Sequence, residues 1–390
     1  MVLPQTKLTK FTTHTMSEET TFYEELQKIE DLDLRDKRGM KHDLSFVLFG
    51  LIIGLLRNRD GKMSSLHRHM VNAHKDICAA LSVDIERVIS RAHLPRILEK
   101  VNRNVFEKLI FDKYGITLTK EEKKWFAGDG KELRGSIEKG DKRGEAVVQL
   151  VEHQSRQVVA QTFYNGTKES EKPCLRALIK EKELHSQKIT TDALHLNPEM
   201  TESINENGGT FLIGLKENQQ LLFDEMKFNI ASNKPLAKHQ TIDKGHGRLE
   251  IRNYEAYGIS GAYIDERWSA SNFQMVIQVE RVREELKTNT LSTEVSYYIT
   301  NGKPENYEEY FNAMRAHWSV EVNNHYRDVT LKEDKFRTKI KPVSRIMAGC
   351  RTVVLELLKL LKPKNMIALL ESFQDNFDVL ISSLKTLKFL

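Results

Sequence analysis

The chain has 390 residues, of which 39% are hydrophobic and 29% are charged. It is longer than the roughly 100–200 residues of a typical domain, and its composition excludes a disordered or fibrous protein. The three cysteines, Cys78, Cys174 and Cys350, are too far apart for a CxxC pair, which argues against a disulfide scaffold or a zinc ribbon. The net charge of +5 permits a polyanionic partner without requiring one.

The first part of the chain predicts a terminus followed by helices. Residues 1–20 are polar, Thr-rich and aperiodic, so we expect a disordered terminus. Residues 21–118 have helical apolar spacing and recurring basic residues, which predicts a helical domain. The apolar run 46–56 has 11 residues, against about 20 for a bilayer span, and is interpreted as a buried helix. Without a signal peptide or a span, we expect a cytoplasmic protein with no membrane partner.

A second region begins after Lys123, where β-branched and aromatic runs alternate with helical ones. The predicted strands and helices are, in chain order, strands at 125–128, 146–151 and 157–164, a helix at 171–184, a strand at 188–192, a helix at 198–207 and a strand at 211–215. Three strands, a helix, a strand, a helix and a strand is the order expected of a ribonuclease H-like core.

The rest of the chain is predicted as an insertion followed by helices. Residues 217–300 contain further strand candidates at 249–257, 273–281 and 295–300, so they are interpreted as a β-rich insertion. Helical spacing resumes at Tyr307 and continues to the end. The predicted fold class is therefore α/β: a ribonuclease H-like catalytic core with a β-rich insertion over residues 119–390, including C-terminal helices, after the N-terminal helical domain.

Two aspartates stand near the ends of predicted core strands. Asp129 follows an apolar strand, and Asp192 ends the β-branched strand 188–192. A polar residue in a glycine-assisted turn would explain Asp129 alone, and a helix N-cap would explain Asp192, although the next predicted helix begins only at Pro198. An acid at the end of each of two core strands is harder to attribute to turns.

A third acid lies on the first helix after the insertion. Aromatic and apolar residues recur there at helical spacing, and Glu321 falls about 40° from Tyr307 within that stripe, at about 100° per residue. A carboxylate on a packed face is costly without a compensating cation. A salt bridge to Arg315 or Arg327 is one explanation, and a metal ion is the other. The same stripe predicts that Trp318 is a core residue.

These three acids suit a two-metal site. Carboxylates from two strands and one helix could hold two Mg²⁺ ions about 4 Å apart, with Mn²⁺ as a substitute, for in-line displacement at phosphorus. No cluster with HExxH or CxxC spacing competes as a zinc site. From 331 to 365 there are ten Lys or Arg and three Asp or Glu, a local charge of +7 that suits either a solvated helix face or a polyanion.

Several segments around these acids resemble those of one known family. Residues 127–136 (AGDGKELRGS), 189–195, 211–218 (FLIGLKEN), 246–252 (HGRLEIR) and 315–321, followed by His325, Asp328, Glu333, Asp334 and Arg337, are similar in content and order to segments of transposases of the H-repeat-associated (ISAs-type) insertion-sequence group. The similarity spans most of the chain. One departure is Val322, since the family usually has Asn directly after the third acid.

The resemblance implies a DDE transposase. Catalysis and metal binding would fall to Asp129, Asp192 and Glu321, and the N-terminal helices would be a transposase-associated DNA-binding domain. The residues implied as DNA contacts are Lys131, Arg134, Lys216, His246, Arg248, Arg315, His325, Lys335 and Arg337. Trp318 and His325 could alternatively touch a distorted end base.

The implied reaction is Mg²⁺-dependent cleavage at element ends, followed by transfer of the 3′-hydroxyl to target DNA. The implied partners are double-stranded DNA, as terminal inverted repeats and target, and a second copy of the chain, which forms a homodimer on DNA. The setting would be the bacterial cytoplasm, in association with the nucleoid. Two alternatives stay open: a metal-dependent nuclease without strand transfer, and a domesticated DNA-binding regulator.

Overall fold

The computed structural model describes residues 20–57, 60–115, 122–245 and 247–390. Residues 1–19 of the predicted disordered terminus, and the candidate DNA contact His246, lie outside the described residues. The α-helices are α1 (Phe22–Lys28), α2 (Leu44–Arg57), α3 (Met63–Asn72), α4 (His74–Leu81), α5 (Leu94–Leu98), α6 (Arg103–Tyr114), α7 (Lys168–Glu181), α8 (Pro198–Glu206), α9 (Gln220–Ser232), α10 (Tyr307–Ala316), α11 (Trp318–His325), α12 (Lys341–Leu360), α13 (Met366–Asp375) and α14 (Phe377–Thr386).

The β-strands form one large mixed sheet, so the α/β class is confirmed. They are β1 (Trp125–Glu132), β2 (Ala146–Glu152), β3 (Val158–Tyr164), β4 (Lys188–Thr191), β5 (Thr210–Leu215), β6 (Ala237–Gly245), β7 (Arg248–Gly258), β8 (Met275–Glu285) and β9 (Thr290–Thr300). Their order across the sheet is β3-β2-β1-β4-β5-β9-β8-β7-β6. Strands β1, β4 and β5 run parallel to one another, and β2 and β3 complete an antiparallel meander with β1.

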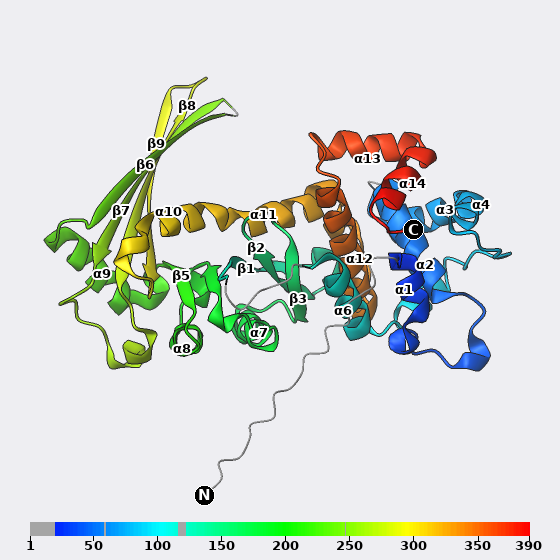
Figure 1. Cartoon of the computed structure of the whole chain (residues 1–390), viewed down its shortest axis with the longest axis horizontal. Helices are drawn as coiled ribbons and strands as arrows, with labels where there is room; N and C mark the ends of the chain where they lie inside the picture. Colours follow the sequence, from blue (N-terminus) through cyan, green and yellow to red (C-terminus); the bar gives the residue numbers. More distant parts are fainter. Residues whose placement is uncertain (1–19, 58–59, 116–121, 246) are drawn as a thin grey trace, which may run out of the picture.

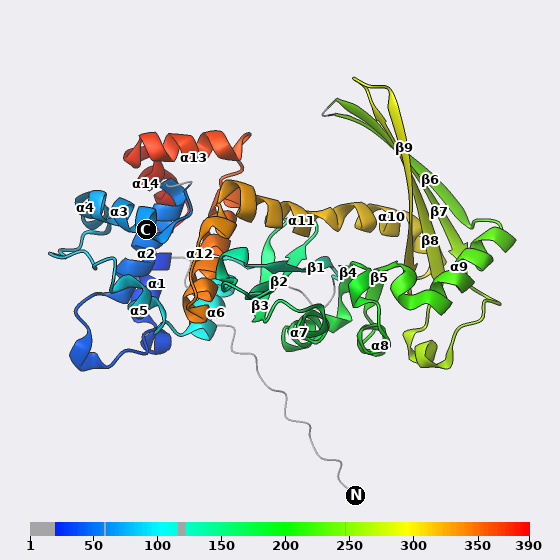
Figure 2. The ribbon, with the colours of Figure 1, turned by 180° about the vertical axis from the view of Figure 1, so that it is seen from behind.

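Helices cover both faces of the first five strands (Figures 1 and 2). On one face, Leu175 of α7 packs so close to Gly128 that a Cβ there would lie 3.0 Å from it. On the other face, Val320 of α11 packs with Ala127 of β1 and Val151 of β2. Successive residues of a strand point to opposite faces. Strand β1 therefore directs Gly128 and Gly130 toward α7, and Ala127 and Asp129 toward α11.

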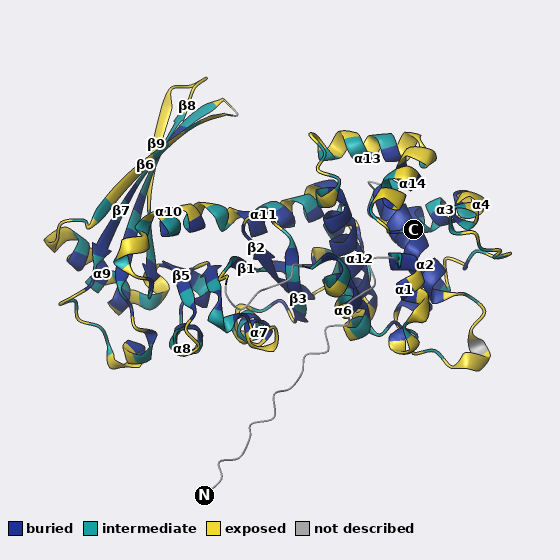
Figure 3. Cartoon of the chain, in the orientation of Figure 1, coloured by how far each residue is buried: buried dark blue, intermediate teal, exposed yellow. Residues whose placement is uncertain are grey.

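The insertion extends the core sheet. Strand β9 pairs antiparallel with β5, and β8, β7 and β6 follow outward, projecting well beyond the helices (Figure 1). The predicted strands at 249–257, 273–281 and 295–300 are present and mostly longer than predicted. Strand β6 was missed because its residues are mostly polar and exposed, with no alternating apolar pattern to reveal it (Figure 3).

The first and last helices share one hydrophobic core. Helix α2 is almost entirely buried, as predicted for the run 46–56, and no helix in the described ranges is long and apolar enough to cross a bilayer. Side chains from 22–114 and from 331–389 form a single cluster, and both chain segments lie at the end of the molecule opposite β6–β9 (Figures 1 and 2). The last helices thus pack on the N-terminal helices, although the sequence analysis grouped them with residues 119–390.

Candidate active site

The strand register brings Asp129 beside Asp192. Strands β1 and β4 are parallel and pair Trp125 with Lys188 through to Gly128 with Thr191. The next residues in this register are Asp129, which is still within β1, and Asp192, which directly follows β4. Residues that continue two parallel strands in register lie at the same level of the sheet. Two acids separated by 63 positions in sequence therefore stand at one edge of the core, and Asp192 also accepts a backbone hydrogen bond from Leu194 at 3.0 Å.

A fourth carboxylate, which the sequence analysis did not single out, lies against this edge. A Cβ on Gly130 would come within 2.5 Å of the Glu171 carboxyl carbon, so glycine is what allows α7 to approach β1 here. Tyr164 donates a hydrogen bond to Glu171 at 2.7 Å, and the His195 ring lies 3.2 Å away. Burial, which raises the pKa of Glu171, is outweighed by these partners, so the net shift is downward and the group stays ionised.

The surroundings of Asp129 disfavour its charge. Burial, the Asp192 carboxylate and the Glu171 carboxylate raise its pKa to about 7, with Glu321 adding to the effect and the Gly130 N–H partly opposing it. The Asn324 side chain donates a hydrogen bond to Asp129 Oδ2 at 3.0 Å. Carboxylates that repel one another at one edge of a sheet form a site of strongly negative potential.

Glu321 lies on an exposed face of its helix, which corrects the sequence analysis. The helical stripe holds through Tyr310 and Phe311, which are buried, but the helix is interrupted at His317, between α10 and α11. Beyond that break the stripe no longer points inward. Trp318, predicted as a core residue, is 63% exposed, so that prediction was wrong. Neither Arg315 nor Arg327 pairs with Glu321, because they bind Asp243 and Glu333 respectively.

At the helix break, His317 turns toward the core strands. Its Nδ1 lies 2.9 Å from the Thr190 hydroxyl, and His153 Nε2 lies 2.9 Å from the same hydroxyl. Burial lowers the pKa of His317 to about 4 and that of His153 to about 3, so both rings are neutral near pH 7. This hydrogen-bonded chain fixes the break to β4, two residues before Asp192. The residues following the break, including Glu321, are thereby positioned.

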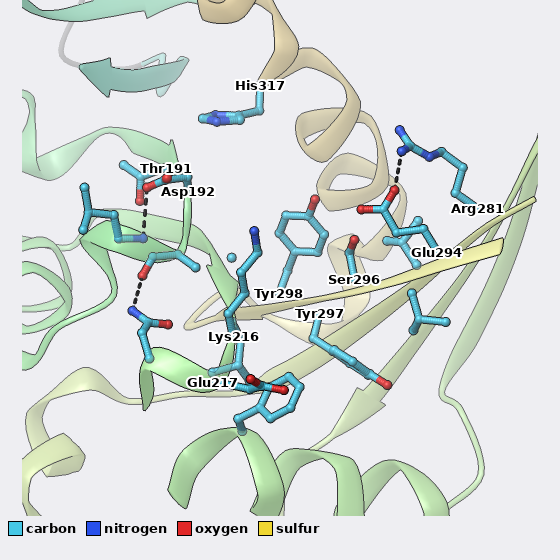
Figure 4. Close-up of a pocket in the computed structure, with 18 of the residues that line it drawn as sticks. Thr191, Asp192, Lys216, Glu217, Arg281, Glu294, Ser296, Tyr297, Tyr298 and His317 are labelled. Atoms are coloured by element: carbon cyan, nitrogen blue, oxygen red, sulfur yellow. Dashed lines mark hydrogen bonds and ion pairs between the residues drawn. The ribbon is translucent and has the colours of Figure 1, made fainter. Parts of the chain in front are cut away.

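Two of the acids line a cavity of about 840 Å³ between the core and the base of the insertion. Asp192 and Glu321 contribute from the core side, and Arg252, Arg281 and Tyr298 contribute from the inserted strands. Figure 4 shows Asp192, Lys216 and His317 around the hollow, and an ion pair between Arg281 and Glu294 on the other side. The walls therefore carry both carboxylates and cations, which suits a substrate with anionic groups.

The acids are close enough to influence one another electrostatically, but their oxygen atoms are not close enough together to coordinate one ion. Asp192, Glu171 and Glu321 all act on Asp129, yet among the described residues no three His, Cys, Asp or Glu side chains stand ready to hold one metal ion. Coulombic repulsion acts over longer distances than a shared coordination sphere, so the two observations agree. The donor set consists of carboxylate oxygens, which is the chemistry that Mg²⁺ prefers.

Lys131, a candidate DNA contact, is a buried structural residue in this structure. Its Nζ lies 2.7 Å from Asp328, 3.2 Å from Glu333 and 3.4 Å from Asp334, and the side chain is 7% exposed. Burial, which lowers its pKa, is outweighed by Glu333 and Asp328, so the group is held charged. Lys131 is therefore not available to a DNA phosphate, and this expectation needs correction.

The other candidate DNA contacts fall into separate places. Lys216 is exposed in the cavity beside Asp192, while Lys335 and Arg337 are exposed in a second cavity near the N-terminal helices. Arg315 is exposed but paired with Asp243 of β6. The remaining three are Arg134, exposed in the turn after β1, Arg248, at the start of β7, and His325, exposed at the end of α11.

Several site residues were missed by the sequence analysis. Asn324 was overlooked because the family resemblance points to the position directly after the third acid, which is Val322 in this chain. Asn324 follows Glu321 by three residues, one helical turn, and that spacing could have suggested it. Glu171, Tyr164 and His195 come from separate elements, and no local pattern in the sequence connects them.

Comparison with known proteins supports the resemblance seen in the motifs. No family model matches the chain. It is 23% identical over 338 residues to an Escherichia coli O157:H7 protein named "Putative transposase YncI", covering 84% of this chain and 85% of that protein. It is 24% identical over 346 residues to the "H repeat-associated putative transposase YhhI" of Escherichia coli strain K12, covering 84% and 87%.

Among solved structures, the chain is similar to a piggyBac transposase in a synaptic complex with hairpin DNA. The TM-score is 0.40 at 10% identity, with 94% of this chain and 76% of that chain covered. The sequence relatives confirm the resemblance: over most of its length the chain is similar to proteins named as transposases, including one of the H-repeat-associated group.

Proposed function

We propose that the chain is a metal-dependent DNA transposase in which Asp129, Asp192 and Glu321 hold the metal ions. The observation that carries the proposal is the pairing of β1 with β4, which sets Asp129 beside Asp192 while α11 carries Glu321 over the same face. Burial, together with repulsion by the Asp192 and Glu171 carboxylates, raises the pKa of Asp129 to about 7, and bound cations would offset both effects. The names of the sequence relatives support the same reaction class.

The core of this proposal is a ribonuclease H-like fold. Its support is the element order β1-β2-β3-α7-β4-α8-β5, which is the order expected of that core. In it, the two aspartates come from neighbouring central strands and the glutamate from a helix after the insertion. The β6–β9 strands form the β-rich insertion and continue the same sheet.

In such a site Mg²⁺ ions would activate a water or a 3′-hydroxyl and stabilise the leaving oxygen during displacement at phosphorus. The chain itself would orient the acids. Asn324 holds the Asp129 carboxylate, and the His317–Thr190–His153 chain fixes the helix break that precedes Glu321. Lys216, exposed in the cavity beside Asp192, would contact a phosphate next to the reacting one. Mg²⁺ keeps several waters, so few protein ligands suffice.

The partner in this proposal is double-stranded DNA, first as the terminal repeats of an element and then as target. Arg134, Arg248, Arg315, His325, Lys335 and Arg337 are proposed as further DNA contacts, with a homodimer assembled on paired ends. The protein would act in the bacterial cytoplasm at the nucleoid. The support for these points is the resemblance of the sequence motifs to those of the transposase family.

The test is a cleavage assay on duplex DNA that carries the inverted repeats flanking the gene, with Mg²⁺ or Mn²⁺. We expect nicks at the repeat ends and, with target DNA present, joined products. Removing a residue that only supports a metal ligand typically lowers activity about 10–100-fold. Asp192 is proposed to bind the metal directly, so Asp192→Asn should lower the cleavage rate at least about 100-fold.

The matched control is Glu294→Gln, which removes a carboxylate that lines the same cavity from the inserted strand β9. It should keep wild-type cleavage to within a few fold. Equal cleavage by wild type and Asp192→Asn would contradict the catalytic assignment. Cleavage without joined products would instead favour the nuclease alternative.

A further inference from the structure

A second large cavity lies between the N-terminal helices and the loop that precedes α12. Its volume is about 1110 Å³, larger than the roughly 300–1,000 Å³ of most small-molecule sites. One wall is formed by residues 62–64 and by Arg91, Ala92 and Pro95, and the other by residues 334–338. The two walls are more than 230 positions apart in sequence, so only the fold creates this cavity.

The lining is strongly cationic. Lys62, Arg91, Lys335 and Arg337 are exposed at the cavity, and Asp334 is the single carboxylate among the lining residues. The Asp334 carboxylate is engaged elsewhere, by Lys131 at 3.4 Å and Arg134 at 3.8 Å. Lys62 lies 3.4 Å from Asp60, while in the described part of the chain Arg91, Lys335 and Arg337 have no carboxylate partner. Arg91, Lys335 and Arg337 are therefore available to an anionic ligand, while Lys62 adds its charge beside Asp60.

The wall formed by residues 334–338 is held firmly at two points. Toward β1, Thr338 donates a backbone hydrogen bond to Gly135 at 3.1 Å, and a Cβ on Gly135 would lie 1.9 Å from the Phe336 carbonyl. Toward the N-terminal helices, a Cβ on Gly61 would lie 2.4 Å from the Lys332 carbonyl oxygen. Backbone packed this closely on both sides fixes the path of the loop that carries Lys335 and Arg337, so the loop itself needs little ordering when a ligand binds.

The same wall is connected to the candidate active site. Asp334 is bonded to Lys131, which follows Asp129 by two residues on β1. A ligand held in this cavity is thus tied through one ion-paired cluster to the strand that carries the first acid. A chain of phosphates could extend from one cavity toward the other, whereas a small free anion would not use so large a volume.

We infer that this cavity binds the phosphate backbone of duplex DNA. The N-terminal helices contact the DNA from one wall, and the loop before α12 contacts it from the other. The inference rests on the proposed function and adds a location to it, with Lys62 and Arg91 as contacts that no motif indicated. Lysine and arginine on opposite walls, without an aromatic platform among the lining residues beyond the buried Phe336, favour backbone contacts over base stacking.

The experiment measures the affinity of a fluorescein-labelled 30-base-pair duplex as a function of salt, with the full chain and no divalent metal. The variants are Lys335→Ala/Arg337→Ala and Lys62→Ala/Arg91→Ala. The control is Lys234→Ala/Lys385→Ala, which removes two exposed cations that line neither cavity. Each phosphate contact contributes about 0.9 to the slope of log K against log salt. Each cavity variant should therefore reduce that slope by up to about 1.8, and the control should leave it unchanged.

Thermal unfolding confirms that every variant is folded before binding is compared. Wild-type slopes in both cavity variants, or an equal loss in the control, would overturn the inference. The inference would also be overturned if the cavity variants bound an RNA duplex more weakly than wild type but bound the DNA duplex as tightly as wild type. Because no metal is present, the result does not depend on catalysis. A chain that cleaves nothing can still show the reduced slopes, and an active chain can fail to show them.

Discussion

Two clusters of charged side chains lie two residues apart on β1, and they differ in how charge is balanced. Around Asp129, burial and the carboxylates of Asp192, Glu171 and Glu321 raise the pKa of Asp129 to about 7. Around Lys131, the acids Asp328, Glu333 and Asp334 are matched by cations, including the fully buried Arg327. The Lys131 cluster is complete as it stands and holds the fold together. The Asp129 cluster is costly to the fold, which is a reason to assign it a ligand.

The largest expected effect tests the balanced cluster. Glu333 is 4% exposed, its Oε1 lies 2.7 Å from Arg327, and burial is outweighed by Arg327 and Lys131, so its pKa lies well below the ordinary range. Glu333→Ala leaves two buried cations without this partner and should cost about 3–5 kcal/mol of stability in urea unfolding. The control Glu86→Ala, at an exposed position, should cost little. A loss of under 1 kcal/mol for Glu333→Ala would show that this cluster is not needed.

The next effect tests the unbalanced cluster and has the opposite sign. The folded chain holds a proton on Asp129 up to about pH 7, while its ordinary pKa is 3.8. Since the folded state binds the proton more tightly, the penalty is absent below pH 3.8 and grows as the pH rises toward 7. At about 1.4 kcal/mol per unit, Asp129→Asn should stabilise the metal-free protein by up to about 4 kcal/mol at pH 8 and very little at pH 4.

Unfolding by urea across that pH range measures the effect, with the exposed Asp84→Asn as control. The control should follow the wild-type pH profile. An Asp129→Asn variant that is less stable than wild type at pH 8 would mean that burial and the neighbouring carboxylates do not disfavour the charge of Asp129.

A smaller effect concerns the close approach of Glu171. Gly130→Ala places a methyl group within 2.6 Å of both Glu171 Oε1 and the Tyr164 hydroxyl, so α7 or its side chains must shift. Overpacking of this kind costs about 1–3 kcal/mol, and we expect cleavage to fall with it. Gly245→Ala, where no atom lies within 4 Å of the added Cβ, is the matched control. Wild-type stability and cleavage in Gly130→Ala would show that the position of Glu171 does not matter.

The smallest effect lies at Trp318. Because its side chain is 63% exposed, Trp318→Ala should change stability by no more than about 0.5 kcal/mol. Trp268, which is 1% exposed, provides the contrast: Trp268→Ala should cost about 3–5 kcal/mol in the same assay. Comparable losses of stability at the two positions would support the original prediction that Trp318 is a core residue.

The core strands could be predicted from sequence because each is a short apolar or β-branched run with clear ends. Asp129 and Asp192 were found for the same reason, since a polar residue at the end of such a run is conspicuous. Strand β6 could not be found, because its residues face solvent and their pairing with β7 is made by backbone hydrogen bonds.

The face of Glu321 was misjudged for a physical reason of its own. Helical spacing was extended through His317 into α11, where the buried residues are Ser319, Val320 and Asn323, so Trp318 and Glu321 fall on the exposed side. Lys131 was misjudged as well, because its three acidic partners lie about 200 positions further along the sequence. No pattern within one segment reports such a partner.

The shared core of residues 22–114 and 331–389 has a consequence for the order in which the protein is made. The first helices leave the ribosome before the central sheet, yet much of the apolar surface that they need lies in residues 331–389, which are synthesised after it. Until then helix α2, nearly all apolar, has an exposed face that a chaperone would shield. The helical end of the molecule is therefore closed only after residues 331–389 have been synthesised, and a nascent chain would hold its central sheet before it holds the cationic cavity beside it.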